Sequence, residues 1–347
     1  MRKQRIIVIL CLICSLLCGC AQPRLSERAI VKAIYLDQID GVIEAALVVF
    51  TGASGTNLSD VQSKARVYTG SANSVDAAIA AAESKQNKKP FYAHNGLLIL
   101  GSGAVQGNVL PLLQYFTDGE LSRQNLSVFF TVATQEEIVK QEQYMTEIVQ
   151  ICERQMNQSA GTRTAQSIDA LRENACGYLP ILKLQDSETV PAQMDGLLLL
   201  QNGYAITVMQ NLMMQLALLC TQQTNHLTLR FVVDDVDTVL LTQNLFLQKE
   251  IKNQQLFIKL CGRAERCTQN GRVLRDDAQK HALACANEQL EQAFLQLQDI
   301  TFLQGNDIFR FAWWLRQQDN NAVEQLLAEE QFYQPQRIHF QSAVRAQ

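Results

Sequence analysis

The first twenty residues constrain this chain most strongly. A positive segment that includes Arg2 and Lys3 precedes an apolar stretch of thirteen residues, 6–18, which only Ser15 interrupts. This stretch is too short to cross the roughly 30 Å hydrocarbon core of a bilayer as a permanent helix. It has the length of the apolar core of a secretory signal. We therefore predict that residues 1–19 form a signal peptide and that the mature chain is exported.

The signal ends in Leu17-Cys18-Gly19-Cys20, which resembles a bacterial lipobox at positions 17–20. In that motif, the thiol of the last cysteine receives diacylglycerol and cleavage follows just before it. Two acyl chains anchor a protein stably where one is marginal, since each buried CH₂ contributes about 0.8 kcal/mol. We expect lipid on Cys20 to hold the mature chain at a membrane. The alternative is an ordinary secretory signal that is cut near Gly19.

The charge balance argues against nucleic-acid binding. The formal net charge is −4, and loss of the three basic residues of the signal lowers it to about −7. Sequence-independent binding of nucleic acid needs clustered Lys and Arg to replace counterions, and the sequence has no such cluster. No later stretch reaches 18 apolar residues. We therefore expect the mature chain to lie outside the bilayer.

Six cysteines remain beyond Cys20. They are Cys152, Cys176, Cys220, Cys261, Cys267 and Cys285. An even number in an exported chain permits disulfides, with fifteen connectivities. However, none of them forms a CxxC pair, and no histidine stands at zinc-finger spacing. We therefore favour buried or incidental thiols over a metal site.

Apolar runs predict a βββαβαβ order in the first part of the chain. The expected elements are strands 29–36, 42–50 and 65–69, a helix capped by Ser74 and running to Ser84, strand 91–100, helix 104–116 and strand 126–132. The first two strands form a hairpin, with turn residues over 37–41. This order is typical of a sheet with helices packed on it. We assign residues 20–134 to an N-terminal α/β domain.

Residues 135–193 are predicted to be a helical and divergent connecting region. Thr134 and Glu137 have the spacing of a capping box that opens a helix. The apolar face of that helix follows at helical spacing and consists of Ile138, Met145, Ile148, Val149 and Cys152. The polar stretch 187–191 indicates a domain boundary.

Residues 194–347 are assigned to a C-terminal α+β domain. Asn202-Gly203 between two apolar runs is a strong hairpin signal, because both residues tolerate positive φ. The further elements expected are helix 211–220, strands 227–233, 238–247 and 256–260, a helix capped by Asp276 and running to about Gln298, a helix after Asn306, a helix over about 321–329 and a last strand at 337–344. The predicted fold class is thus α+β and multi-domain, with mixed or antiparallel sheets, each covered by helices.

Seven segments, taken in order, resemble the Ger(x)C family, the C-subunit lipoproteins of spore germinant receptors. They are LSERAIVKAIYLD (25–37), FYAHNGLLILG (91–101), the segment 112–123 that ends YFTDGELSR, the strand 128–133, GLLLL (196–200), DIFRFA (307–312) and the last strand, 338–344. The chain departs from the family pattern at Ala93, where Gly is usual, and at Ser102, where Glu is usual. Together with the lipobox, the ordered set covers nearly the whole mature chain.

The resemblance implies a function and a fold. Members of this family are lipid-anchored at the outer face of the spore inner membrane. They act in a complex with two integral-membrane proteins, the A and B subunits, which detects nutrients and triggers germination. The family has no established catalytic role and no metal or cofactor, and its fold consists of several α/β layer domains. Contact of this subunit with a small-molecule germinant would be indirect.

Few residues are candidates for chemistry. His94 lies in a similar segment but has no carboxylate or cysteine at ligand spacing, so we favour a structural or interface role. Asp118, Glu120 and Arg123 are closely spaced beside an apolar helix, and a salt bridge or helix cap is the simpler interpretation. The adjacent residues 313 and 314 are both tryptophan and face different directions on a helix. We take Trp314 as the candidate for contact with a partner or membrane interface.

Two other classes of protein remain as alternatives. A solute-binding lipoprotein of a transporter would show parallel βαβ repeats in both halves and a cleft between them, whereas each half here opens with an antiparallel hairpin. An envelope hydrolase is disfavoured, because no GxSxG or HExxH motif is present. We therefore predict a receptor-complex subunit that is not an enzyme.

Overall fold

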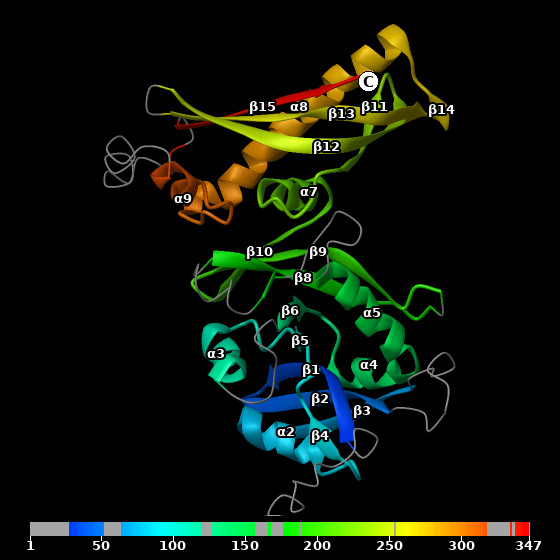
Figure 1. Cartoon of the computed structure of the whole chain (residues 1–347), viewed down its shortest axis with the longest axis vertical. Coiled ribbons are helices and arrows are strands. Elements are labelled where there is room, and N and C mark those ends of the chain that lie inside the picture. The colour runs from blue at the N-terminus through cyan, green and yellow to red at the C-terminus, as the bar shows by residue number, and fades with distance from the viewer. Residues whose placement is uncertain are drawn as a thin grey trace, which may run out of the picture.

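The computed structural model describes residues 28–51, 64–118, 126–156, 166–167, 176–187, 189–252, 255–317, 334 and 337–346. Within these ranges the chain forms two sheets stacked along the long axis, with helices packed against each (Figure 1). The predicted α+β class with mixed or antiparallel sheets is confirmed. The expected signal peptide and Cys20 lie outside the described residues, as does the helix expected over 321–329.

The first sheet has ten strands in the described residues. They are β1 (Arg28–Ile39), β2 (Val42–Thr51), β3 (Lys64–Ala72), β4 (Lys89–Phe91), β5 (Leu97–Leu100), β6 (Ser127–Phe130), β7 (Gln166–Ser167), β8 (Cys176–Leu184), β9 (Ala192–Gln201) and β10 (Tyr204–Met209). The order is β10-β9-β8-β6-β5-β1-β2-β3, with β4 beside β1 and β7 beside β6. Pairing is mixed, because β1 is antiparallel to β2 but parallel to β5.

Helices cover both faces of this sheet. They are α2 (Val75–Glu83), α3 (Leu110–Asp118), α4 (Gln135–Lys140), η2 (Glu142–Tyr144) and α5 (Met145–Met156). Leu36 of β1 packs in one cluster with α2 and α3, whereas its neighbour Tyr35 packs in another with α4 and α5. Successive strand residues point to opposite faces. The central strand β1 is therefore buried on both sides, which explains its nearly continuous apolar run.

Both predicted hairpins are present, each with a two-residue turn. Asp40 and Gly41 join β1 to β2 with φ values of 50° and 82°, and Asn202 and Gly203 join β9 to β10 with 51° and 83°. Two consecutive positive φ values are the signature of the type I′ turn that suits a twisted hairpin. The capping box is also confirmed, with Glu137 N donating to Thr134 and Thr134 N donating to Glu137.

The second sheet has five strands in the described residues. They are β11 (Thr228–Val233), β12 (Val236–Lys252), β13 (Gln255–Gln269), β14 (Arg272–Val273) and β15 (Ile338–Arg345), and the helices beside them are α7 (Asn211–Cys220), α8 (Asp276–Ile300), η4 (Phe302–Gln304) and α9 (Phe311–Arg316). β15 runs parallel to β13, and the other pairs are antiparallel. The inward side chains of the strands join the helices in one hydrophobic cluster.

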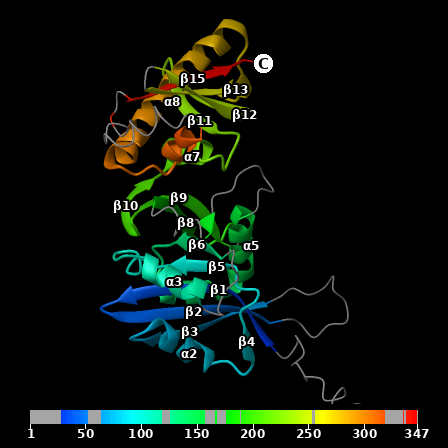
Figure 2. The ribbon, with the colours of Figure 1, turned by 60° about the vertical axis from the view of Figure 1, so that its left-hand side comes forward.

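The two sheets share that cluster. Tyr178, Leu197, Leu199 and Met209 of β8, β9 and β10 belong to the same buried group as the apolar residues of α7 and α8. In both ribbon views α7 lies between the two sheets (Figures 1 and 2). Strands β8, β9 and β10 of the first sheet therefore pack into the same hydrophobic core as the helices of the second layer.

The sheets divide the chain at a different place from the predicted boundaries. The first sheet continues to Met209, so the boundary predicted at 193 and 194 falls inside β9. Residues 187–191 had indicated a linker, but they belong to the short connection between the antiparallel strands β8 and β9, where Gln185 N donates to the Pro191 carbonyl at 2.8 Å. The connecting region predicted over 135–193 contributes β7 and β8 to the first sheet.

Side-chain amides block both free edges of the second sheet. On β11, Thr228 N donates to Gln215 Oε1 at 2.7 Å, and Gln215 Nε2 donates to the Thr228 carbonyl at 3.0 Å. On β15, Val344 N donates to Asn287 Oδ1 at 3.0 Å, and Asn287 Nδ2 donates to the Val344 carbonyl at 3.1 Å. Each amide makes the two hydrogen bonds that another strand would make, which prevents edge-to-edge pairing at that position.

Two helix starts differ from the prediction. The helix expected from Ala104 begins at Leu110, because residues 102–107 are turns and bends and Pro111 suits only the first turn of a helix. The side chain of Asn108 accepts a hydrogen bond from Leu110 N at 2.9 Å. At α8, Arg275 occupies the cap position without a side-chain bond, and Asp276 lies in the first turn.

Candidate functional site

The first candidate site is a buried carboxylate at the end of β1. Asp37 was expected in a turn, but it lies within β1 and is only 4% exposed. Its Oδ1 accepts hydrogen bonds from Gln38 N at 2.8 Å and from Ala104 N at 2.9 Å. The Tyr35 hydroxyl lies 3.2 Å from Oδ2. Asp37 thus joins β1 to the loop that follows β5.

Two glycines make room for this carboxylate. A Cβ on Gly101 would overlap the Asp37 side chain, and a Cβ on Gly103 would overlap the carbonyl of Gln38. Gly101 N also donates to the Leu36 carbonyl at 2.8 Å. These residues lie in the turn that leads from β5 toward α3. Because Gly101 and Gly103 have no Cβ, this turn can approach β1 closely at Asp37 and Gln38.

The Tyr35 hydroxyl extends this cluster to the segment after β6. It lies 3.0 Å from the carbonyl oxygen of Ala133, beside the Thr134 cap of α4. Burial, reinforced by the negative charge of Asp37, raises the pKa of Tyr35 far above its usual value. The hydroxyl therefore stays neutral and serves as a donor. The cluster ties together three separate segments and presents no nucleophile or free base to solvent.

His94 lies in the turn between β4 and β5. Its ring centroid is 5.7 Å from that of Phe91, and the Arg28 guanidinium lies 4.7 Å from the Phe91 centroid. The neighbouring Tyr92 is buried and donates from its hydroxyl to Glu83 Oε1 at 2.6 Å. Within the described ranges no three His, Cys, Asp or Glu side chains are grouped as a metal site would require. His94 is thus part of an aromatic and cationic contact at a half-exposed turn.

A second cluster surrounds α9. Asp307 accepts hydrogen bonds from Phe311 N at 2.9 Å and from Ala312 N at 2.7 Å, so it stabilises the start of the helix. The half-buried Lys249 places its Nζ 5.3 Å from the ring centroids of both Phe311 and Trp314. Burial lowers the pKa of Lys249. Trp314, expected to contact a partner or membrane, packs partly buried against the core with Lys249 over its ring.

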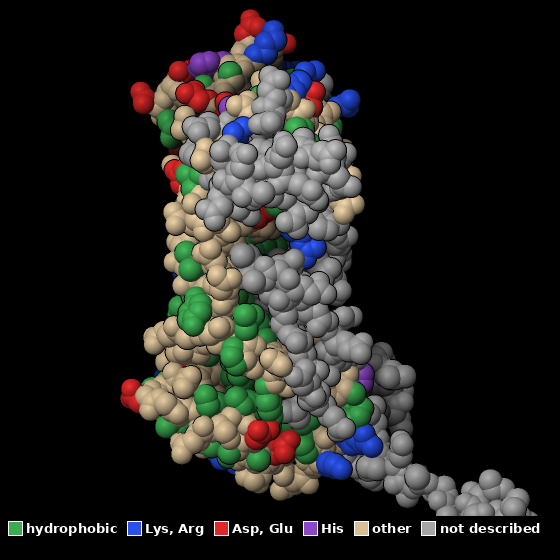
Figure 3. All heavy atoms as spheres, turned by 90° about the vertical axis from the view of Figure 1, so that its left-hand side faces the viewer, with side chains coloured by type: hydrophobic (Ala, Val, Ile, Leu, Met, Phe, Trp, Pro, Cys, Tyr) green, Lys and Arg blue, Asp and Glu red, His purple; other side chains and the backbone are tan. Residues whose placement is uncertain are grey.

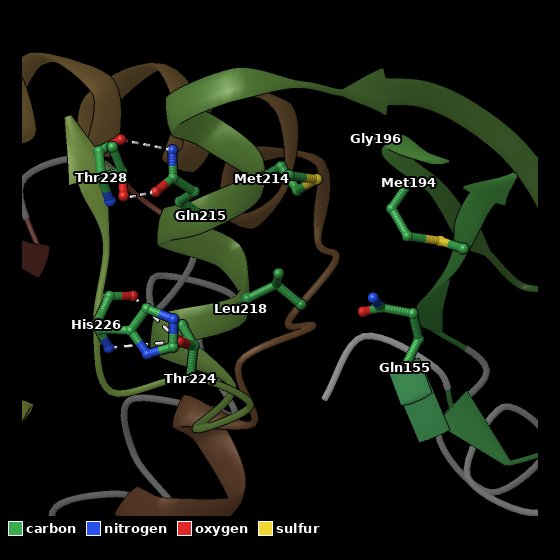
Figure 4. Close-up of a pocket in the computed structure, with 9 residues that line it drawn as sticks. All are labelled: Gln155, Met194, Gly196, Met214, Gln215, Leu218, Thr224, His226 and Thr228. Atoms are coloured by element: carbon green, nitrogen blue, oxygen red, sulfur yellow. Dashed lines mark hydrogen bonds between the residues drawn. The ribbon is translucent and has the colours of Figure 1, made fainter. Parts of the chain in front are cut away.

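A small cavity of about 220 Å³ separates the two layers (Figure 4). Met214 and Leu218 of α7 face Met194 of β9 and Gln155 of α5 across it. On the α7 side, Thr224 and His226 lie within hydrogen-bond distance of each other, at 3.3 Å. Among the described residues, no Asp, Glu, Lys or Arg lines the cavity to match the two charges of a free amino acid.

The buried cysteines fit the prediction of buried thiols. Cys152, Cys220 and Cys267 are free and buried, whereas Cys261 and Cys285 are free and partly exposed. Burial raises the pKa of Cys152 and of Cys220 to about 12. These two thiols are therefore protonated at neutral pH and poor nucleophiles.

The sequence itself matches a known domain. Residues 22–184 match the profile of a family described as "Spore germination protein N-terminal domain". The matched range ends at Leu184, the last residue of β8. Residues 22–184 therefore form the N-terminal domain of a spore germination protein.

The fold resembles that of a solved structure. The chain resembles the structure described as "Crystal Structure of the GerBC protein", with a TM-score of 0.55 and 11% sequence identity over 90% of this chain and 96% of that one. At this identity the likeness establishes the fold. No curated protein matches the sequence significantly. None of the described helices has the length and apolar character needed to cross a bilayer.

The Ger(x)C-like segments meet in the structure. The segment ending at Asp37 and the segment ending at Gly101 are adjacent parallel strands, and 128–133 follows on the next strand, β6. Asp37 was missed as a site residue because its position after an apolar run suggested a turn. Of the other candidates, Cys20, Glu120 and Arg123 lie outside the described residues, as does the side chain of Asp118. Their roles stay predictions.

The Asp307 cluster predicts a pH dependence of stability. Burial raises the pKa of Asp307, against the opposing effects of its backbone donors and Lys249. The folded state therefore binds this proton more tightly than the unfolded chain. The stabilisation that the Asp307 carboxyl contributes is fully present below its pKa in the unfolded chain, near 3.9. It is lost as the pH rises through the pKa of Asp307 in the folded protein.

We expect Asp307→Asn, which cannot ionise, to escape this loss. The unfolding free energy of the variant should improve relative to wild type as pH rises above about 4, then run parallel once Asp307 is fully ionised. Urea unfolding from about pH 3 to about pH 8 measures the difference. A difference that stays constant over this range contradicts the prediction.

Proposed function

We propose that this protein is the lipid-anchored C subunit of a nutrient germinant receptor complex. Diacylglycerol on Cys20 holds it at the outer face of the spore inner membrane, where the integral-membrane A and B subunits are its partners. It acts by binding to these partners and performs no catalysis. The observation that carries the proposal is the match of residues 22–184 to the spore germination domain.

The candidate sites support an interaction protein. Asp37 accepts hydrogen bonds from two backbone amides and lies beside the Tyr35 hydroxyl. Asp307 accepts hydrogen bonds from two backbone amides of α9. These carboxylates hold segments of the fold in place and neither is set beside a nucleophile. Polar clusters that stabilise the fold itself fit a protein that acts by binding other proteins through its surface.

A solute-binding lipoprotein is the alternative function. The 220 Å³ cavity between the layers is the feature that favours it. Against it, each sheet contains an antiparallel hairpin, β1–β2 in the first and β11–β12 in the second, where a transporter lobe would have parallel βαβ repeats. Ligand titration separates the two: tight binding of one small molecule by the isolated chain would favour the transporter function.

Replacement of Cys20 by Ser tests the anchor. We expect Cys20→Ser to move the protein from the membrane fraction to the soluble fraction in cells that lack the A and B subunits. The serine hydroxyl does not receive the diacylglycerol that is transferred to a cysteine thiol, so the variant has no lipid anchor. Fractionation after a high-salt wash measures the change. The matched control is Cys261→Ser, which removes a partly exposed thiol and should leave the protein on the membrane.

Two further results decide the complex. In spores, affinity purification of the wild-type chain should recover two polytopic membrane proteins, and spores with Cys20→Ser should germinate slowly with nutrients but normally with a non-nutrient trigger. Retention of the variant on membranes that lack both partners would refute the anchor. Recovery of transporter permease subunits would favour the alternative function.

A further inference from the structure

The outward face of the second sheet is free of helices in the described residues. The inward side chains of β13, such as Leu256, Ile258 and Leu260, are buried against the helices. Lys259 and Cys261 alternate with them and are partly exposed on the other face. Acidic and basic side chains are both visible at the upper end of the molecule (Figure 3).

A groove of about 760 Å³ lies on this face across β12, β13 and β15. Among the residues that line it are Phe246, Lys259, Cys261, Arg263, Ala343 and Arg345. The register of the three strands shows how these residues are arranged. Phe246 pairs with Cys261, which pairs in turn with Ala343, and so these three form an apolar row. We call the surface formed by these six residues the basic groove.

Basic rows flank the apolar row on both sides. Two residues before Cys261 along β13 is Lys259, and two residues after it is Arg263, which pairs directly with Arg345 of β15. Alternate residues of a strand are about 6.8 Å apart. The groove therefore presents a cation, an apolar strip and a pair of cations at regular spacing, and no acidic residue lines it.

The arginine pair is electrostatically unfavourable by itself. Like charges directly opposite each other on neighbouring strands are destabilising. Among the described residues, neither Arg263 nor Arg345 forms a salt bridge, and neither does Lys259. On the same face, Glu250 is already paired with Lys252 at 2.7 Å. Two adjacent guanidinium groups are well suited to bidentate contact with carboxylates.

The position of the groove favours a protein occupant. Cys20 precedes β1, and in both ribbon views β1 lies in the lower half of the molecule, away from the second sheet (Figures 1 and 2). An extended linker over 20–27 reaches about 28 Å at most. A membrane held through Cys20 therefore belongs at the lower end, and the upper face is left for a partner.

We propose that the basic groove binds an extended acidic segment of a partner protein. An apolar side chain of that segment lies on Phe246, Cys261 and Ala343, while carboxylates on either side of it meet Lys259 and the arginine pair. This inference rests on the proposed lipid anchor at Cys20, which leaves the upper face free, but it does not depend on which membrane proteins complete the complex.

Fluorescence anisotropy with a labelled peptide tests the proposal. The probe has the pattern Glu-Ser-Phe-Ser-Glu, and the comparison peptide has Lys in place of each Glu. The protein is the full chain in detergent micelles at low salt, where charge pairs are least screened. We expect the acidic peptide to bind and Arg345→Glu to weaken it about tenfold or more, because the change removes one cation and repels the carboxylates.

The same variant carries its own check on folding. Arg345→Glu replaces a like-charge pair with an opposite-charge pair beside Arg263, so its melting temperature should rise while peptide binding falls. The matched control is Lys85→Glu with Lys89→Glu, which changes two exposed charges in the first layer and should leave affinity within about twofold.

Four results would overturn the proposal. Wild-type affinity in Arg345→Glu would show that the arginine pair does not bind the peptide. Equal weakening in the Lys85 and Lys89 control, or equal binding of the basic peptide, would show unspecific attraction. If the Cys20→Ser chain binds phosphatidylglycerol vesicles through Arg345 and ignores the peptide, the groove contacts a membrane instead.

Discussion

Asp37→Ala is expected to destabilise the protein by about 3–5 kcal/mol. The change leaves the backbone amides of Gln38 and Ala104 without their acceptor, and it removes the acceptor beside Tyr35. Each buried donor left unsatisfied costs about 1–3 kcal/mol. Urea unfolding of the unlipidated chain at neutral pH measures the loss.

The control for this variant is Asp40→Asn at the tip of the same hairpin. Asp40 is exposed with φ of 50°, a conformation that Asn also tolerates, so the expected change is within about 0.5 kcal/mol. Asp37→Asn should fall between the two, because its amide keeps one acceptor oxygen. If Asp37→Ala unfolds at the same urea concentration as Asp40→Asn, the carboxylate does not hold the loop after β5 in place.

Asn287→Leu is expected to cost about 2–4 kcal/mol and to promote self-association. The variant loses both hydrogen bonds to the backbone of Val344 and the bond that Ser342 Oγ donates to Oδ1 at 2.6 Å. It also leaves the edge of β15 open to another strand. Urea unfolding measures the first effect, and light scattering against protein concentration measures the second.

Gln296→Leu is the matched control, because it adds an exposed leucine to the same helix without touching β15. It should change stability by less than about 0.5 kcal/mol and leave the protein monodisperse. If both variants associate equally, added surface hydrophobicity is the cause and the edge-blocking function of Asn287 is wrong.

The sequence predicted those elements whose signals are local. The Asn202-Gly203 turn and the Thr134 capping box depend on a few neighbouring residues, and both are present. The second sheet was outlined correctly, although β12 and β13 extend to Lys252 and Gln269, beyond the predicted ends. The extensions over 248–252 and 261–269 are largely polar, so a search for apolar runs does not detect them.

Long-range pairing limited the prediction of domains. β8 pairs with β9 and with β6, and through β6 it joins strands far earlier in the chain. Nothing near residues 176–184 reports these partners. The loop 187–191 has the composition of a linker, whereas the structure uses it to connect two strands of one sheet.

The polar clusters were equally hard to foresee. Asp37 and Ala104 are 67 positions apart, and Lys249 meets Trp314 across a similar separation. A single sequence gives no sign that such residues meet. The small residues Gly101 and Gly103 were the available signal, because consecutive strand-end glycines indicate that another part of the backbone approaches closely.

The core common to both layers has a mechanical consequence. To swing the upper sheet away from the lower one, water would have to reach Tyr178, Leu197, Leu199 and Met209, at roughly 1.5–3 kcal/mol for each side chain. The junction between the two sheets is therefore rigid and does not act as a hinge. A pull on the second sheet would therefore move the first sheet together with it.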